Sequence, residues 1–292
     1  MSPSSIRGVI TAMITPFAED GSVDLDAARQ LARYLVEHGS HGVVVAGTTG
    51  ENPTLSDDEQ LELLRTVKDE IGAAATVIAG TGTNDTRHSV HLTEASAEAG
   101  ADACLVVTPY YNKPSPAGLR AHFAAVAAAT DRPIVLYNIP SRCVINMPPE
   151  LLAEIAAEND NVVAVKQANN DELGPIEGLD VLAGNDEIFL RTLEVGGTGG
   201  ILVSSHVVGD EMRAVYDAFE AGDLDRAREL QQGLAPVYEA MTVTSNPTPV
   251  KTALELMGVA SARVRLPMVE ADEEQRAAVR AALEAHGTLA AA

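Results

Sequence analysis

Short apolar runs, rich in β-branched residues, recur along the chain between longer and more polar stretches. Their nearly continuous Val, Ile and Ala character is typical of strands that are buried on both faces. The segments between them are long enough, at about 10 to 20 residues, for helices that cross from one parallel strand to the next. Eight such runs occur, at residues 8–14, 42–46, 76–80, 103–108, 133–137, 162–166, 180–184 and 200–204.

The segments between the runs carry helical signals. Over residues 24–38 the apolar positions recur at helical spacing, so a stripe of Leu and Ala side chains from Leu25 to Leu35 faces one side. A second helix is predicted to begin at Ser56, because Glu59 three residues later completes a capping box. Regular alternation of strands and helices indicates a parallel α/β fold.

Eight strands is the number that a closed (β/α)8 barrel requires, and the 292 residues of the chain exceed the roughly 250 that this fold typically uses. An open, doubly wound sheet is the alternative architecture, but it favours a Gly-rich phosphate loop after the first strand. Residues 14–17, Ile-Thr-Pro-Phe, provide no such loop. We therefore predict an α/β protein of the (β/α)8 TIM-barrel class.

Helical patterns continue after the eighth strand, at residues 223–241, 248–257 and 272–286. No low-complexity linker separates them from the strands that precede them. We therefore predict a barrel over residues 1–222 and a C-terminal helical extension, packed on the barrel, over residues 223–292.

The charge of the chain narrows the classes of function. Its 20 Lys and Arg residues stand against 42 Asp and Glu residues, which gives a net charge of −22. A surface of that sign repels phosphate backbones and anionic lipids, so nucleic-acid and membrane partners are disfavoured. The N-terminal residues combine a single Arg with no long apolar run, unlike a signal peptide or a membrane helix. We expect a cytoplasmic protein.

The candidate chemistry starts from lysine, of which the chain has four. Lys68 falls on a polar helix face, Lys113 in a loop and Lys251 in the C-terminal extension. Only Lys166 closes an apolar strand, where partial desolvation favours the free amine that attacks a carbonyl. The alternative is a strand-end lysine that extends into solvent, and the residue alone does not decide between the two.

Other reactive side chains are expected near Lys166, because barrel enzymes place them where strands end and loops begin. Residues 47–50, Gly-Thr-Thr-Gly, put two hydroxyls and several N–H groups on one turn, which suits a carboxylate, although such turns are common. Tyr137 ends the strand before that of Lys166, so its phenol is a candidate to move protons to and from an imine. Arg142 follows shortly after, placed to bind a second carboxylate or to form a surface ion pair.

Other chemistries are less favoured. His88 with His91, and His38 with His41, lie in helical or helix-end segments without converging carboxylates, so we predict no metal site. The chain has two cysteines, Cys104 in an apolar run and Cys143 in a loop. Two are too few for a disulfide framework, and their spacing is not that of metal ligands. No Walker loop and no Gly-x-Ser-x-Gly elbow occurs.

Several motifs taken together resemble one family. Residues 47–51 (Gly-Thr-Thr-Gly-Glu), residues 137–142 (Tyr-Asn-Ile-Pro-Ser-Arg) and the strand-end Lys166 look like those of the dihydrodipicolinate synthase and N-acetylneuraminate lyase superfamily. The likeness spans almost the whole chain. Further segments that resemble the synthase branch are residues 108–114, 246–251 and 265–268.

The resemblance implies a class I aldolase that condenses pyruvate with L-aspartate 4-semialdehyde to 4-hydroxy-tetrahydrodipicolinate, in lysine and diaminopimelate biosynthesis. Lys166 would form the imine with pyruvate, which removes the need for a metal or an organic cofactor. Tyr137, Thr48 and Tyr111 would relay protons. Tyr111 would come from the adjacent subunit, which implies a homotetramer built as a dimer of dimers.

By the same resemblance, the residues that bind substrate would be Thr49, Arg142, Gly184 and Ile201, with Arg142 on the carboxylate of the semialdehyde. One alternative is a pyruvate-dependent aldolase or lyase that acts on another aldehyde, of the sugar-acid or 4-hydroxy-2-oxoglutarate type. A second is a non-catalytic barrel that binds oxo acids. The presence of a nucleophile disfavours this second alternative, because binding alone needs none.

The effector pocket of lysine-inhibited relatives is matched only in part. Asn84 and Tyr110 agree with it. Asp57 and Gln60, however, fall in the segment where those relatives have histidines, and His88 falls where they have a glutamate. We predict that inhibition by lysine is weak or absent.

Overall fold

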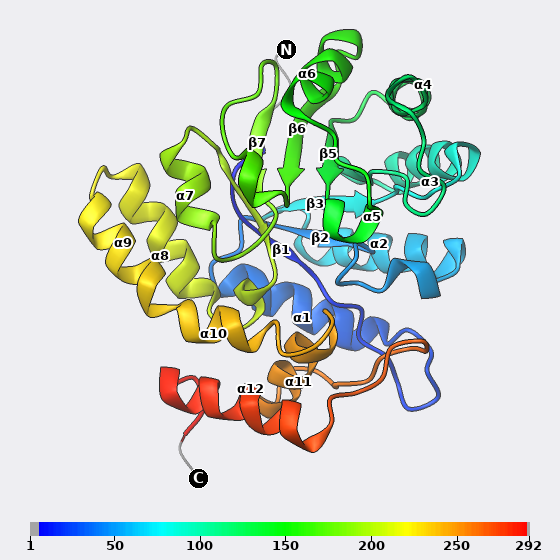
Figure 1. The fold of residues 1–292 in the computed structure, drawn as a ribbon. Coiled ribbons are helices and arrows are strands. Elements are labelled where there is room, and N and C mark those ends of the chain that lie inside the picture. The colour runs from blue at the N-terminus through cyan, green and yellow to red at the C-terminus, as the bar shows by residue number, and fades with distance from the viewer. Residues whose placement is uncertain (1–5, 291–292) are drawn as a thin grey trace.

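Eight parallel strands close into a barrel, in which each strand pairs with its neighbours in chain order and β8 pairs with β1. The computed structural model describes residues 6–290, and Figure 1 shows the strands at the centre of the molecule with helices around them. The predicted α/β class and TIM-barrel architecture are confirmed. The strands are β1 (Gly8–Ala12), β2 (Gly42–Val45), β3 (Thr76–Gly80), β4 (Ala103–Val107), β5 (Ile134–Asn138), β6 (Val162–Gln167), β7 (Asp180–Ala183) and β8 (Gly199–Leu202).

All eight strands begin and end within two residues of the predicted bounds, because continuous apolar runs identify strands with two buried faces. Helices follow every strand except β6, which is connected to β7 through a 3-10 turn, and they cover the outside of the barrel. Short 3-10 turns lie at Asn52–Thr54 (η1), Asn170–Glu172 (η2) and Ser204–His206 (η3). The helices are α1 (Leu25–Glu37), α2 (Asp57–Ile71), α3 (Thr86–Glu98), α4 (Pro116–Ala127), α5 (Pro140–Cys143), α6 (Pro149–Glu158), α7 (Phe189–Glu194) and α8 (Gly209–Glu220).

The helix starts follow from local side chains. The Asp24 carboxylate accepts a hydrogen bond from the Ala27 N–H at the start of α1. Ser56 and Glu59 form the predicted capping box at the start of α2, each side chain accepting from the other's backbone N–H. The loop predicted around Cys143 is wrong, because this residue ends the one-turn helix α5. Pro140 begins that helix, where its fixed φ and missing N–H are compatible with a first turn.

Within residues 223–290, the described part of the predicted C-terminal extension, the chain forms four helices. The single stretch predicted over residues 223–241 is divided in two near Leu234, because Pro236 has no N–H to continue the backbone bonds of the helix before it. Figure 1 shows the extension, in yellow to red, along one side of the barrel, with α12 farthest from the strands. The helices are α9 (Leu224–Gly233), α10 (Ala235–Ala240), α11 (Thr248–Leu256) and α12 (Glu273–His286).

The extension shares its core with the barrel. Leu254 of α11 and Leu283 of α12 belong to the same buried cluster as Val9 of β1 and Leu35 of α1. A separate cluster fills the interior of the barrel, where Ile201 of β8 packs with side chains from the other strands. The interior is therefore a packed core, which leaves the ends of the strands as the place for a cavity. Within residues 6–290, no helix is both long and apolar enough to cross a membrane.

Candidate active site

Tyr137 and Lys166 lie side by side at the carboxyl ends of β5 and β6, where the two residues are direct partners in the strand register. The Lys166 Nζ atom lies 4.4 Å from the centre of the Tyr137 ring. Both side chains are buried, with 5% and 4% of their surface exposed. Among the described residues, neither Nζ nor the Tyr137 hydroxyl forms a hydrogen bond or an ion pair, so both remain available to a ligand.

The turn after β2 presents two threonines to the same space. Thr49 is buried, and its hydroxyl oxygen accepts a hydrogen bond from the Asn246 side-chain amide at 2.9 Å, which leaves the hydroxyl proton free. Within residues 6–290, the N–H groups of Thr48 and Thr49 donate to no acceptor. Two hydroxyls and two unpaired N–H groups on one turn are the donors that a small carboxylate needs.

These residues line one cavity of about 230 Å³. A second cavity of about 220 Å³ lies against it, since Thr48, Tyr137 and Arg142 line both. The first holds the lysine and the threonine turn, and the second is bounded by Cys143 and the end of β4. Together they provide room for a small oxo acid beside Lys166 and for a second small molecule.

Arg142 is exposed at the mouth shared by the two cavities. Arg142 does not form the surface ion pair that was its alternative role, because no acidic side chain of residues 6–290 pairs with its guanidinium. A guanidinium that is free of acidic partners and faces a cavity is suited to bind a carboxylate bidentately. Cys143 lies nearby, but burial raises the pKa of its thiol to about 11, so it is no competing nucleophile at neutral pH.

The other predicted site residues divide into those near the cavity and those away from it. Gly184 lines the cavity with Lys166, and a Cβ atom there would lie 2.7 Å from the Ala168 Cβ, so only glycine fits. Ile201 is fully buried in the barrel interior and does not line the cavity with its side chain. Tyr111 is 87% exposed and lies outside both cavities of this chain.

Sequence reasoning missed Asp186, a buried residue that lines the same cavity. Its carboxylate accepts hydrogen bonds from the N–H groups of Val203 and Ser204 and from the Ser204 hydroxyl. Burial raises its pKa. The role of Asp186 in fixing the loop after β8 follows from a contact between two loops, and no spacing within the sequence indicates it.

Reasoning from the sequence also did not identify Lys251 as a buried residue. It is 0% exposed and pairs with Glu51, which follows the threonine turn. Lys68 forms an ion pair with Asp102 on the outside of the barrel. Within the described residues, Lys166 is therefore the lysine that faces the cavity.

No group of three or more His, Cys, Asp or Glu side chains among residues 6–290 is arranged to hold a metal ion. His88 instead pairs with Asp57 at 2.9 Å, and His91 lies 3.8 Å from the same carboxylate.

Comparison with known proteins identifies the family of this chain. Residues 5–286 match the model of the dihydrodipicolinate synthetase family. A relative from Moorella thermoacetica, named 4-hydroxy-tetrahydrodipicolinate synthase, is 47% identical over 289 residues, which cover 96% of this chain and 98% of the relative.

Solved structures give the same result. The chloride-inhibited dihydrodipicolinate synthase of Acinetobacter baumannii, complexed with pyruvate, is 34% identical with a TM-score of 0.93, over 98% of this chain and 100% of that chain. The enzyme of Cyanidioschyzon merolae, solved with lysine bound, is 38% identical with a TM-score of 0.94, over 97% and 99%. This chain therefore belongs to the dihydrodipicolinate synthetase family.

Proposed function

We propose that this chain is a 4-hydroxy-tetrahydrodipicolinate synthase, a lyase that condenses pyruvate with L-aspartate 4-semialdehyde in lysine and diaminopimelate biosynthesis. The observation that carries the proposal is the Lys166 amine beside Tyr137, in a cavity that the threonine turn also lines. The relatives that share most of their length with this chain carry the same name.

The first half of the reaction forms and uses an imine. The Lys166 amine attacks the pyruvate carbonyl, water leaves, and a protonated imine results, which acts as an electron sink. Thr49 and the N–H groups of the turn hold the pyruvate carboxylate. The relay of Tyr137 and Thr48 then accepts a proton from the methyl group, which gives an enamine.

The second half joins the two substrates. The enamine carbon attacks the aldehyde of the semialdehyde, whose carboxylate is bound by Arg142. The amine of the semialdehyde then attacks the imine carbon, which closes the ring and releases Lys166 as the free amine. No metal or organic cofactor enters this sequence, since the lysine imine is the electron sink.

We also propose that Tyr111 completes the active site of a neighbouring subunit, in a homotetramer built as a dimer of dimers. Tyr111 has φ +73° and its neighbours form a tight turn, in which the Asn112 N–H donates to the Tyr110 carbonyl at 2.9 Å. A bulky residue in this strained conformation needs surrounding contacts to hold it. Its 87% exposure in the single chain leaves those contacts to a partner.

The shared core bears on how the chain is organised. We propose that residues 223–292 are an extension of the barrel of residues 1–222 and not an independent domain. One cluster of buried side chains runs from β1 to α12, which supports a single folding unit.

Substrate profiling tests the proposed function. Purified protein is incubated with pyruvate and L-aspartate 4-semialdehyde, and the product is identified by mass spectrometry. Parallel reactions contain N-acetylneuraminate or 4-hydroxy-2-oxoglutarate. We expect turnover in the first reaction only. Turnover of a sugar acid, with none of the semialdehyde, would replace the synthase by another pyruvate-dependent lyase.

A further inference from the structure

Glu51 and Lys251 form an ion pair in the interior of the protein. Lys251 is 0% exposed and Glu51 is 3% exposed, and the lysine Nζ lies 2.5 Å from a carboxylate oxygen of Glu51. Glu51 comes directly after the turn of residues 47–50, whereas Lys251 lies on α11 in the C-terminal extension. The pair therefore joins the turn that carries the site threonines to a distant part of the chain.

Each partner makes a further contact with the extension or the barrel. The Lys251 Nζ donates to the Arg263 carbonyl at 2.6 Å and lies 4.2 Å from the centre of the Phe17 ring. The second carboxylate oxygen of Glu51 accepts from the backbone N–H of Arg265 at 3.0 Å. The carboxylate of Glu51 thus holds α11 and the segment after it at the same time.

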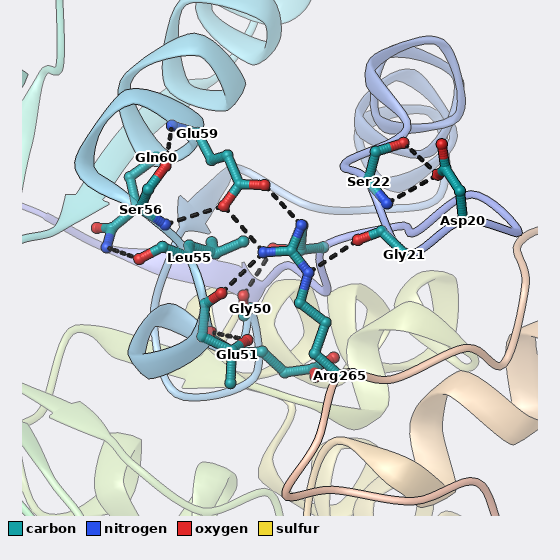
Figure 2. Close-up of polar contacts among 12 residues, drawn as sticks. Asp20, Gly21, Ser22, Gly50, Glu51, Leu55, Ser56, Glu59, Gln60 and Arg265 are labelled. Atoms are coloured by element: carbon teal, nitrogen blue, oxygen red, sulfur yellow. Dashed lines mark hydrogen bonds and ion pairs between the residues drawn. The ribbon is translucent and has the colours of Figure 1, made fainter.

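The Arg265 side chain contacts the segment that follows Glu51, up to Glu59, as Figure 2 shows. Its guanidinium forms a double ion pair with Glu59 at 2.6 and 2.9 Å. It also donates to the carbonyls of Thr54 and Gly21. Residues 51–59 are therefore tied to the extension at both ends of the segment.

The turn itself is under backbone strain. Ala46 and Glu51 lie on either side of it with φ +53° and +56°, in the left-handed region that non-glycine residues disfavour. One contact that holds the turn comes from the loop after β1, where the Thr15 hydroxyl donates to the Gly50 carbonyl at 2.6 Å. Strained conformations persist only where surrounding contacts determine them. The side chain of Glu51 supplies such a contact at the end of the turn.

Stability alone is a weak explanation for a fully buried ion pair. Desolvation of two charges offsets much of their attraction, and well-packed apolar residues often replace such pairs without loss of stability. Here burial lowers the pKa of Lys251 to about 8, against the opposite effect of Glu51. A pair that is costly to bury but joins two segments is better explained by the conformation that it fixes.

We propose that Glu51 and Lys251 are positioning residues for the active site, which hold the Thr48–Thr49 turn in the geometry that binds the pyruvate carboxylate. This proposal rests on the proposed function. It makes the C-terminal extension a part of the site, because two of its residues contact the turn. Asn246, just before α11, donates to the Thr49 hydroxyl, and Lys251, within α11, pairs with Glu51.

Three variants test the pair: Lys251→Met, Glu51→Gln and the double variant. Each single variant leaves one partner buried without its counter-charge. The double variant removes both charges at similar side-chain volume, so it is the one expected to fold as the parent does. Lys68→Met is the matched control, because Lys68 also forms a lysine–carboxylate ion pair, with Asp102, remote from the cavity.

The kinetic readout separates a positioning role from a structural one. In the double variant we expect the KM for pyruvate to rise by about tenfold or more, because small displacements of binding groups are costly. We expect the KM for the semialdehyde to change by less than about twofold, since Arg142 lies outside the turn. A merely structural role would lower the active fraction, and so kcat, and leave both KM values unchanged. In the control Lys68→Met we expect kcat and both KM values to be unchanged.

Amide hydrogen exchange gives a readout that needs no substrate. The Glu51 and Asn52 N–H groups donate within the turn, to the carbonyls of Thr48 and Gly47. We expect faster exchange in the peptide that covers residues 46–55 of each pair variant, and unchanged exchange in Lys68→Met. If the wild-type protein does not condense pyruvate with the semialdehyde, the proposed function is wrong. The comparison of hydrogen exchange between the wild type and the pair variants still tests the role of the ion pair in that case. A folded double variant with unchanged exchange and an unchanged KM for pyruvate would overturn the proposal.

Discussion

The Lys166 Nζ lies 4.4 Å from the centre of the Tyr137 ring, at paired positions on two neighbouring parallel strands. Side chains at paired positions of parallel strands point to the same side of the sheet, so this register brings the lysine and the phenol together at the rim of the barrel. The amine and the phenol are thus held by two paired strands of the barrel.

Replacement of Tyr137 by phenylalanine tests the proton transfer. The variant keeps the ring but loses the hydroxyl, so we expect kcat to fall by about 10²- to 10⁴-fold, the usual contribution of one acid–base group. The KM for pyruvate is expected to change far less. Tyr216→Phe is the control, because Tyr216 lies on α8 and packs on His41, outside the cavity. A kcat within about twofold of the wild type in Tyr137→Phe would exclude the relay.

Replacement of Arg142 by lysine tests the second carboxylate. Lysine keeps the charge but loses the bidentate geometry. A hydrogen bond to a charged group contributes about 1.5–3 kcal/mol, so we expect the KM for the semialdehyde to rise by about 10- to 100-fold. Imine formation with pyruvate is expected to be unchanged. Arg120→Lys, on the outside of the barrel beside Glu154, serves as the control. An equal loss for both substrates would speak against a specific role for Arg142.

Two buried histidines predict a loss of stability in mild acid. His206 accepts a hydrogen bond from the Ile14 N–H at 3.1 Å, which requires a neutral ring, and burial lowers its pKa to about 4. Burial also lowers the pKa of His122 to about 4. The unfolded chain, with pKa values near 6.5, therefore binds more protons than the folded chain between about pH 4 and 6.5.

From this difference we expect the free energy of unfolding to fall as pH drops from 7 to 5, by about 2 kcal/mol for each histidine. Urea unfolding at the two pH values measures it. His206→Gln keeps an acceptor but does not titrate, so its stability should depend less steeply on pH. An identical pH dependence in the variant and the wild type would show that His206 is not held neutral.

Inhibition by lysine is expected to be weak or absent. Asp57 and His88, two of the residues on which this expectation rests, pair with each other at 2.9 Å. A rate assay with increasing L-lysine measures the effect. Strong cooperative inhibition at sub-millimolar lysine would contradict this expectation.

The fold, and the place of Lys166 at a strand end in the candidate site, were predictable from the sequence because both depend on local patterns. Continuous apolar runs identify strands buried on two faces, and a lysine at the end of one such run is recognisable without a structure. The division of residues 223–241 into α9 and α10 was not predicted, although Pro236 is visible in the sequence. In that segment the helical periodicity outweighed the proline signal.

Contacts between distant segments account for what the sequence did not reveal. Lys251 lies 200 positions from Glu51, and nothing in its neighbourhood indicates that it is the most buried lysine of the described chain. Asp186 likewise finds its hydrogen-bond donors in another loop, the N–H groups of Val203 and Ser204. Burial of polar residues depends on the packing of whole elements, which local patterns do not contain.

Reductive trapping on Lys166 tests the central claim most directly. The protein is incubated with pyruvate and borohydride, digested, and its peptides are mapped by mass spectrometry, with Lys166→Met as the matched variant. We predict a reduced pyruvate adduct on the peptide that contains Lys166, and no adduct on Lys68, Lys113 or Lys251. An unmodified Lys166 in the wild-type protein, or an adduct that persists in Lys166→Met, would contradict the proposed mechanism.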